Sequence, residues 1–116
     1  MRFIQFAATF LSAIWLALVM APAPAIATEF EKEVMFSGSG AGQLQIISTT
    51  DIDLFQPLIE AFQKRHPTLS ILYVQASSTN VFEAITSSDY NFDLAISSAM
   101  DLQTKAANDG YASEYR

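Results

Sequence analysis

The chain has 116 residues, no cysteine and a formal net charge of −6. This length allows one domain with a small hydrophobic core, and the missing cysteines exclude disulfides and thiolate metal sites. An acidic chain without a basic stripe argues against partners such as nucleic acid or anionic lipid, because both are bound through clustered Lys and Arg.

The N-terminal residues have the layout of a secretory signal peptide. Arg2 supplies a positive charge, residues 3–20 form an apolar run, and prolines follow. Ala25 and Ala27 then supply small side chains for an A-x-A cleavage site. We expect residues 1–27 to be removed, with cleavage after Ala27, and the product to be periplasmic. An uncleaved anchor is the alternative, since a helix through this run could span a bilayer core of roughly 30 Å.

The segment after the signal, residues 28–43, is predicted to be a flexible lead-in without a folded element. It begins with mixed charges, and residues 37–42 are rich in Gly and Ser, which is typical of a flexible linker.

Beyond the lead-in, short apolar runs alternate with segments of helical periodicity. Strands are predicted over residues 44–48, 69–74 and 92–96, and helices over residues 53–66, 79–86 and 100–109. Single helices between strands indicate right-handed βαβ units and a parallel sheet. The sequence therefore predicts an α/β fold in βαβαβα order, with both faces of the sheet covered.

The residues at the element boundaries are similar to those of a known family. The first strand ends in Ser48, Thr49, Thr50 and Asp51, and residues 57–67 read PLIEAFQKRHP before the second strand. Residues 91–100, NFDLAISSAM, form the third strand and its turn. Together they resemble the first lobe of periplasmic solute-binding proteins of ABC transporters, of the iron(III), thiamine and small-anion type.

The resemblance implies a periplasmic-binding-protein-like lobe of type II over residues 44–116, incomplete because the family has two lobes with the ligand between them. It implies capture of a small solute, either iron(III) or a small organic or inorganic anion. It also implies docking on an ABC permease in the inner membrane, with no catalysis and no cofactor.

Hydroxyl side chains gather in the three turns that follow the predicted strands. Ligands of open parallel sheets bind beyond the C-terminal ends of the strands, and helix N-termini offer unpaired N–H groups to anions and polar solutes. The alternative is that these side chains only cap helices. The candidate ligand-binding residues are Ser48, Thr49, Thr50, Asp51, Ser77, Ser78, Thr79, Ser97 and Ser98.

Metal binding and catalysis find little support in the sequence. Asp51 is the nearest candidate for an oxygen ligand to a hard cation, but an Asp at this position is typical of a helix cap. His66 is the sole histidine, which leaves no nucleophile–base pair of the usual kinds. We expect no metal site and no enzyme activity. The alternative functions are a solute-sensing input protein for a membrane histidine kinase, a small exported enzyme, and a truncated remnant without function.

Overall fold

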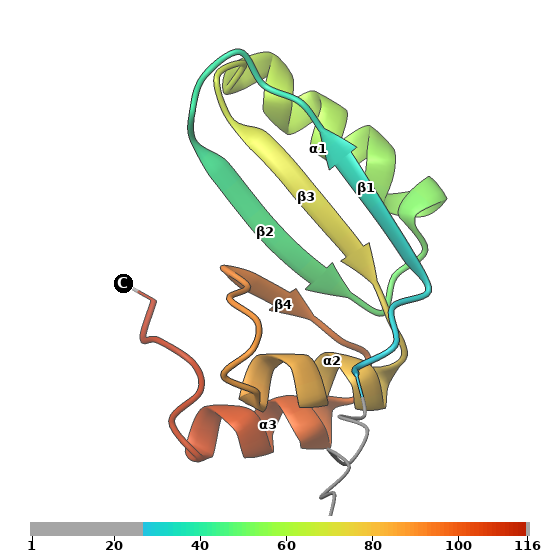
Figure 1. The fold of residues 1–116 in the computed structure, drawn as a ribbon, viewed down its shortest axis with the longest axis vertical. Helices are drawn as coiled ribbons and strands as arrows, with labels where there is room; N and C mark the ends of the chain where they lie inside the picture. Colours follow the sequence, from blue (N-terminus) through green and yellow to red (C-terminus); the bar gives the residue numbers. More distant parts are fainter. Residues whose placement is uncertain (1–26, 116) are drawn as a thin grey trace, which may run out of the picture.

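A computed structural model describes residues 27–115 of the chain. The predicted signal peptide lies outside the described residues, apart from Ala27. No helix in the described range is long and apolar enough to cross a membrane. The elements, drawn in Figure 1, are β1 (Lys32–Phe36), β2 (Gln43–Ser48), α1 (Ile52–Arg65), β3 (Ser70–Gln75), α2 (Ser78–Thr86), β4 (Leu94–Ile96) and α3 (Met100–Asn108).

The four strands form one sheet in the order β1-β3-β2-β4. Strand β2 lies at the centre and runs parallel to both β3 and β4, so the predicted parallel arrangement of three strands is confirmed. The three predicted helices are also present, within two residues of the expected bounds. The fold is therefore a mixed α/β fold, with three parallel strands and one antiparallel edge strand.

The prediction that residues 28–43 contain no folded element was wrong. Strand β1 lies in this segment and pairs with β3 in antiparallel register, with Val34 opposite Tyr73. The side chains of Val34 and Phe36 pack on the core, whereas Lys32 and Glu33 are exposed. Charges are common on edge strands, where they discourage pairing with other chains. In the sequence, these charges obscured the alternation of exposed residues with the core-facing Val34 and Phe36 that indicates a strand.

The Gly/Ser stretch between β1 and β2 is an ordered crossing over the start of β3. The Gly38 N–H donates to Ser70 Oγ (2.9 Å), and the Gly40 N–H donates to the Thr68 carbonyl (3.0 Å). A Cβ atom on Gly38 would lie 2.5 Å from the Leu69 carbonyl carbon, closer than any real contact allows. Glycine is therefore needed at this position because two backbones touch.

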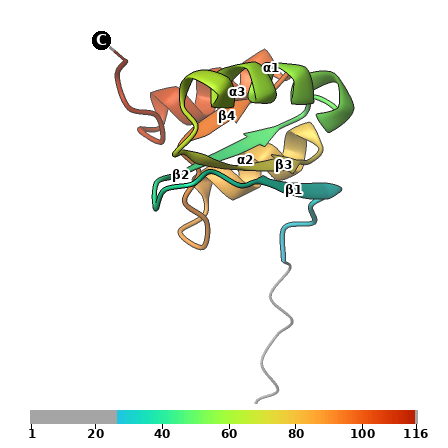
Figure 2. The same ribbon diagram turned by 90° about the horizontal axis from the view of Figure 1, so that it is seen from above.

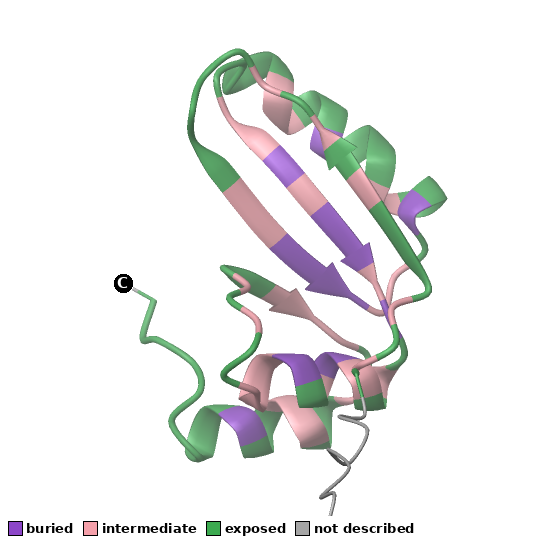
Figure 3. Cartoon of the chain, in the orientation of Figure 1, coloured by how far each residue is buried: buried purple, intermediate pink, exposed green. Residues whose placement is uncertain are grey.

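The core has two halves, one on each face of the sheet. Helix α1 covers one face, and α2 covers the other. Figure 2 shows the sheet nearly edge-on, with α1 above the strands. The first half contains Ile46, Ile52, Ile59, Ile71 and Tyr73, and the second contains Ile47, Val74, Ala76, Val81 and Ala84. Figure 3 shows that burial is concentrated in the C-terminal halves of β2 and β3. The most deeply buried part of the sheet is therefore the part that leads into the candidate site.

Helix α1 carries more apolar surface than the sheet beneath it covers. Ile59 is buried, and Phe55 and Phe62 are half-buried against the core. Leu54 and Leu58 belong to the same apolar stripe, yet their residues are 78% and 59% exposed.

Candidate functional site

The three hydroxyl-rich turns meet at one edge of the sheet, because β2, β3 and β4 are parallel neighbours. We call this the strand-end edge: residues 48–51 after β2, 76–79 after β3 and 97–99 after β4. Hydrogen bonds join the turns. The Ala76 N–H donates to the Ser48 carbonyl (3.0 Å), and the Ser98 N–H donates to Thr49 Oγ1 (3.1 Å). The structure thus brings the predicted site residues together.

Ser48 is buried at the centre of this edge. Its residue is fully inaccessible, and its Oγ accepts a hydrogen bond from the Thr50 N–H (2.9 Å). The hydroxyl of Ser48 therefore shapes the turn and faces the interior, while Thr49 and Thr50 are partly accessible.

Asp51 is the N-cap of α1. Its Oδ1 accepts from the Asp53 N–H (3.1 Å), and its carbonyl accepts from the Leu54 N–H (3.1 Å). The Ile52 N–H donates to Gln75 Oε1 (3.1 Å). The first N–H groups of α1 are therefore already paired within the chain, and the carboxylate of Asp51 adds negative charge. This turn is a poor place for an anion, and the capping alternative describes Asp51 well.

Two residues that hold this turn in place, Gln75 and Tyr73, were missed by the sequence analysis. Gln75 ends β3 and also donates through Nε2 to Glu31 Oε2 (3.1 Å). Tyr73 is fully buried, stacks on Phe55 and donates its hydroxyl to the Thr50 carbonyl (2.8 Å). The sequence did offer a signal: Tyr73 and Gln75 place a phenol and an amide in a mostly apolar strand. Buried polar groups require hydrogen-bond partners, so these two side chains could be expected to bind neighbouring segments.

The buried phenol of Tyr73 makes stability depend on alkaline pH. Burial raises the pKa of the Tyr73 hydroxyl above its ordinary value, a hydrogen bond with Ser48 lowers the pKa in part, and the nearby charge of Asp51 adds a smaller rise. The neutral phenol therefore stabilises the fold fully below about pH 10, and this contribution is lost as the pH rises through the folded pKa. We expect urea midpoints to fall above about pH 10.

The matched control is Tyr73→Phe, which keeps the ring and removes the ionisable group. Its urea midpoint should change less over the same alkaline range than that of the unmodified chain. Identical slopes for the two proteins would show that Tyr73 is not responsible.

The turn after β3 combines capping with accessible side chains. Ser77 is the N-cap of α2, and its Oγ accepts from the Asn80 N–H (3.2 Å). Asn80 Nδ2 donates in turn to the Glu29 carbonyl (2.6 Å). Ser78 is half-buried and Thr79 is exposed. Ser77 is therefore held by its structural role, while Thr79 faces solvent.

The turn after β4 leads into a helix whose N-cap has no side-chain oxygen. The N-cap of α3 is Ala99, which makes no side-chain capping bond, whereas Asp51 and Ser77 cap the other two helices. Ser97 Oγ accepts from the Ala99 N–H (3.1 Å). The side-chain amide of Gln103 pairs with the backbone of Ser97. Its oxygen accepts from the Ser97 N–H (2.9 Å), and its nitrogen donates to the Ser97 carbonyl (3.3 Å). Ser98 remains exposed beside this helix start.

A metal centre finds no support within the described residues. They contain no group of three His, Cys, Asp or Glu side chains that could hold a metal ion. His66 follows the last residue of α1 and stacks on Phe62 at a centroid distance of 4.4 Å. Asp51 is at the opposite end of this 14-residue helix, about 20 Å away.

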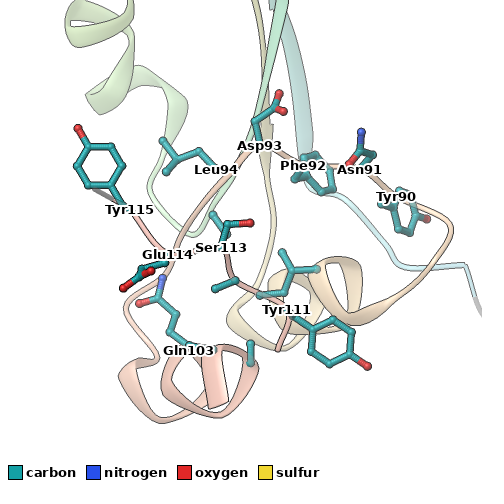
Figure 4. A pocket seen from close by; sticks show the side chains of 15 residues that line it. Tyr90, Asn91, Phe92, Asp93, Leu94, Gln103, Tyr111, Ser113, Glu114 and Tyr115 are labelled. Carbon is teal, nitrogen blue, oxygen red and sulfur yellow. The ribbon is translucent and has the colours of Figure 1, made fainter. Parts of the chain in front are cut away.

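Two hollows lie away from the strand-end edge. One, of about 630 Å³, is bounded by β4, α3 and the C-terminal segment (Figure 4). The other, of about 250 Å³, lies between α1 and the sheet. Neither is lined by any of the predicted site residues. The two hollows are therefore distinct from the candidate site at the strand-end edge.

Comparison with known proteins adds an observation that is independent of the site's geometry. No protein-family model matches the chain, and no curated protein matches it. A solved structure does: the substrate-binding protein of an ABC transporter from Agrobacterium tumefaciens, with 33% sequence identity and a TM-score of 0.69. The match covers 73% of this chain and 27% of that chain, so the chain spans about a quarter of the length of its neighbour. The chain is therefore similar to part of an ABC-transporter substrate-binding protein, both in its fold and in its sequence, where a third of the aligned residues are identical.

Proposed function

We propose that the chain is the ligand-binding part of the substrate-binding component of an ABC uptake transporter. Its strand-end edge captures a small solute, and the protein carrying it docks on a permease in the inner membrane. The signal-like residues 1–27 support a periplasmic location, with cleavage after Ala27. The observation that carries the proposal is the meeting of three hydroxyl-rich turns at one edge of a sheet that resembles a known substrate-binding protein.

The donors at this edge favour an anionic or polar solute over a metal ion. Thr79 and Ser98 are exposed hydroxyl donors, and the first turn of α3 starts without a side-chain cap. A helix N-terminus carries roughly half a positive charge, which favours a small organic or inorganic anion; Asp101 in the first turn of α3 offsets part of this charge. Iron(III) would need ligands from outside the described residues, because these contain no suitable cluster.

The nine predicted residues divide into supporting and contacting groups. Ser48, Asp51, Ser77 and Ser97 accept bonds from backbone N–H groups of their own turns, so they fix the shape of the edge. The residues proposed to contact an anionic group of the solute are Ser78, Thr79 and Ser98. Thr49 and Thr50 lie beside the Asp51 carboxylate and are proposed to contact a neutral polar group of the solute.

The strand-end edge provides one side of a binding cleft, so we expect the chain by itself to bind the solute weakly. A Kd of about 1 mM corresponds to a binding free energy of about −4 kcal/mol, which a few exposed hydrogen bonds can supply. We therefore expect fast exchange and no tight complex.

Titration of the ¹⁵N-labelled chain with inorganic phosphate and with citrate, followed by amide chemical shifts, tests the proposal. We expect the largest shift changes at residues 76–79 and 97–101, with a Kd on the order of 1 mM or weaker. Ser98→Ala should weaken binding several-fold, because it removes an exposed donor at the uncapped helix start.

Ser88→Ala provides the control for this titration. Ser88 is also exposed but lies in the loop before β4, at the opposite end of the sheet, and the loss of its hydroxyl should leave the Kd unchanged. Equal effects of the two variants, or shifts at other parts of the surface, would argue against a solute site at this edge.

A further inference from the structure

The segment that precedes β1 lies at the strand-end edge. Strand β1 is antiparallel to β3, and its first residue, Lys32, is opposite Gln75 at the end of β3. The chain therefore enters β1 beside the arrowhead of β3 in Figure 1, where the turn after β3 begins. We call residues 29–31 the entry segment. It is a fourth piece of chain at this edge, in addition to the three hydroxyl-rich turns.

Backbone and aromatic contacts hold the entry segment in one place. The Glu31 N–H donates to the Gln75 carbonyl (2.9 Å), which extends the pairing of β1 with β3 by one bond. The ring of Phe30 meets Tyr90 edge-on at a centroid distance of 5.2 Å and Phe92 at 6.1 Å. Phe30 also packs on the α2 half of the core. The polar groups of the segment are therefore held at fixed positions beside the turns.

From this position, the entry segment contacts the starts of two helices. The Glu29 carbonyl accepts from Asn80 Nδ2 (2.6 Å), and Asn80 lies in the first turn of α2. The Glu31 carboxylate accepts from Gln75 Nε2 (3.1 Å). Gln75 Oε1 accepts in turn from the N–H of Ile52, the first residue of α1 (3.1 Å). The side chain of Gln75 thus links the entry segment to the turn after β2.

The carboxylate of Glu31 determines which way the amide of Gln75 points. An ionised carboxylate only accepts hydrogen bonds, so it pairs with the amide nitrogen and not with the amide oxygen. The oxygen is thereby directed to the Ile52 N–H, one of the donors at a helix start that have no partner within the helix. Turned the other way, the amide would place its nitrogen against this N–H, donor against donor, and both bonds would be lost.

We propose that Glu31 is a positioning residue for the strand-end edge: it acts through Gln75 to fix the start of α1 and, with it, residues 48–51. The same segment fixes the start of α2 through the Glu29 carbonyl. The consequence for solute binding rests on the proposed function, which makes these two helix starts parts of the site. Groups that are already held in place need not be ordered when a solute binds, and this favours binding.

Amide hydrogen exchange of the ¹⁵N-labelled chain tests this role without any solute, so its outcome is independent of the proposed function. Glu31→Ala should raise the exchange rate of the Ile52 N–H by on the order of tenfold, because the Gln75 amide loses the charged acceptor that orients it. Glu31→Gln has the same net charge as Glu31→Ala but keeps an acceptor oxygen, so it should restore most of the protection. The rate at Ile47, in the central strand, should change far less in both variants.

Lys32→Ala is the control for a second link to this helix, the exposed ion pair between Lys32 Nζ and Asp53 Oδ1 (3.4 Å). Exposed pairs contribute little, so this variant should leave the Ile52 exchange rate within about twofold of its original value. Unchanged protection of Ile52 in Glu31→Ala would overturn the proposal, and so would a Glu31→Gln variant that exchanges as fast as Glu31→Ala. Equal rises at Ile52 and Ile47 would also overturn it, because Glu31 would then stabilise the whole fold and not the start of α1.

Discussion

Gly38→Ala is expected to lower the free energy of unfolding by roughly 3 kcal/mol. The new Cβ would lie 2.5 Å from the Leu69 carbonyl carbon, 2.6 Å from its oxygen and 2.8 Å from its nitrogen. These are backbone atoms at the start of β3, so no side-chain rotation relieves the overlap. The crossing must move away from β3, which loosens β1 as well. Urea denaturation followed by circular dichroism measures the loss.

Gly42→Ala is the matched control, because it lies in the same crossing and meets a movable group. Its Cβ would approach only Leu69 Cδ1, at 3.2 Å, and the end of a leucine side chain can shift by a few tenths of an ångström. We expect a change of less than about 1 kcal/mol. Equal losses for the two variants would show that the close approach at Gly38 is not what requires glycine.

Ile47→Ala should have an effect of similar size by a different mechanism. Ile47 is fully buried near the C-terminal end of β2 and packs with Val74 and Val81 on the α2 face. Truncating a buried isoleucine costs about 2–5 kcal/mol, through lost transfer free energy and the cavity left behind. Small domains are stable by only about 5–15 kcal/mol, so this variant should be partly unfolded near physiological temperature.

The control for Ile47→Ala is Leu54→Ala on α1, where the residue is 78% exposed. Its cost should be within about 0.5 kcal/mol of zero. The two urea midpoints should therefore be clearly separated, with Ile47→Val falling between them. A cost below about 1 kcal/mol for Ile47→Ala would mean that the α2 half of the core contributes little to folding.

The parallel part of the fold could be predicted because its signals are local and strong. The runs at residues 44–48 and 69–74 are almost continuously apolar, and the stripe of α1 has a clear helical period. Gly110, with φ of 88°, ends α3 as a glycine in the left-handed region does. The placement of the candidate residues at one edge followed from parallel pairing alone, because parallel strands end at the same edge of the sheet and each strand leads into its own turn.

Strand β1 and the division of labour within the site could not be predicted in the same way. The apolar face of β1 consists of Val34 and Phe36 only, and its partner β3 follows much later in the chain. The supporting roles of Tyr73 and Gln75 depend on which carbonyl or N–H lies within reach, which only the folded backbone determines. Hydroxyl composition locates the edge, but it does not separate a buried Ser48 from an exposed Ser98.

The arrangement of β1, β3 and β2 constrains the order in which the sheet can assemble. Strands β1 and β2 are consecutive in the chain, yet β3 lies between them in the sheet, so they cannot first form a hairpin. During synthesis both must wait until α1 and β3 have been made, and β3 must then enter a gap with partners on both sides. Such pairing has a high contact order and is intrinsically slow. Strands β1 and β2 therefore stay without β3 as a partner until translation has passed Gln75.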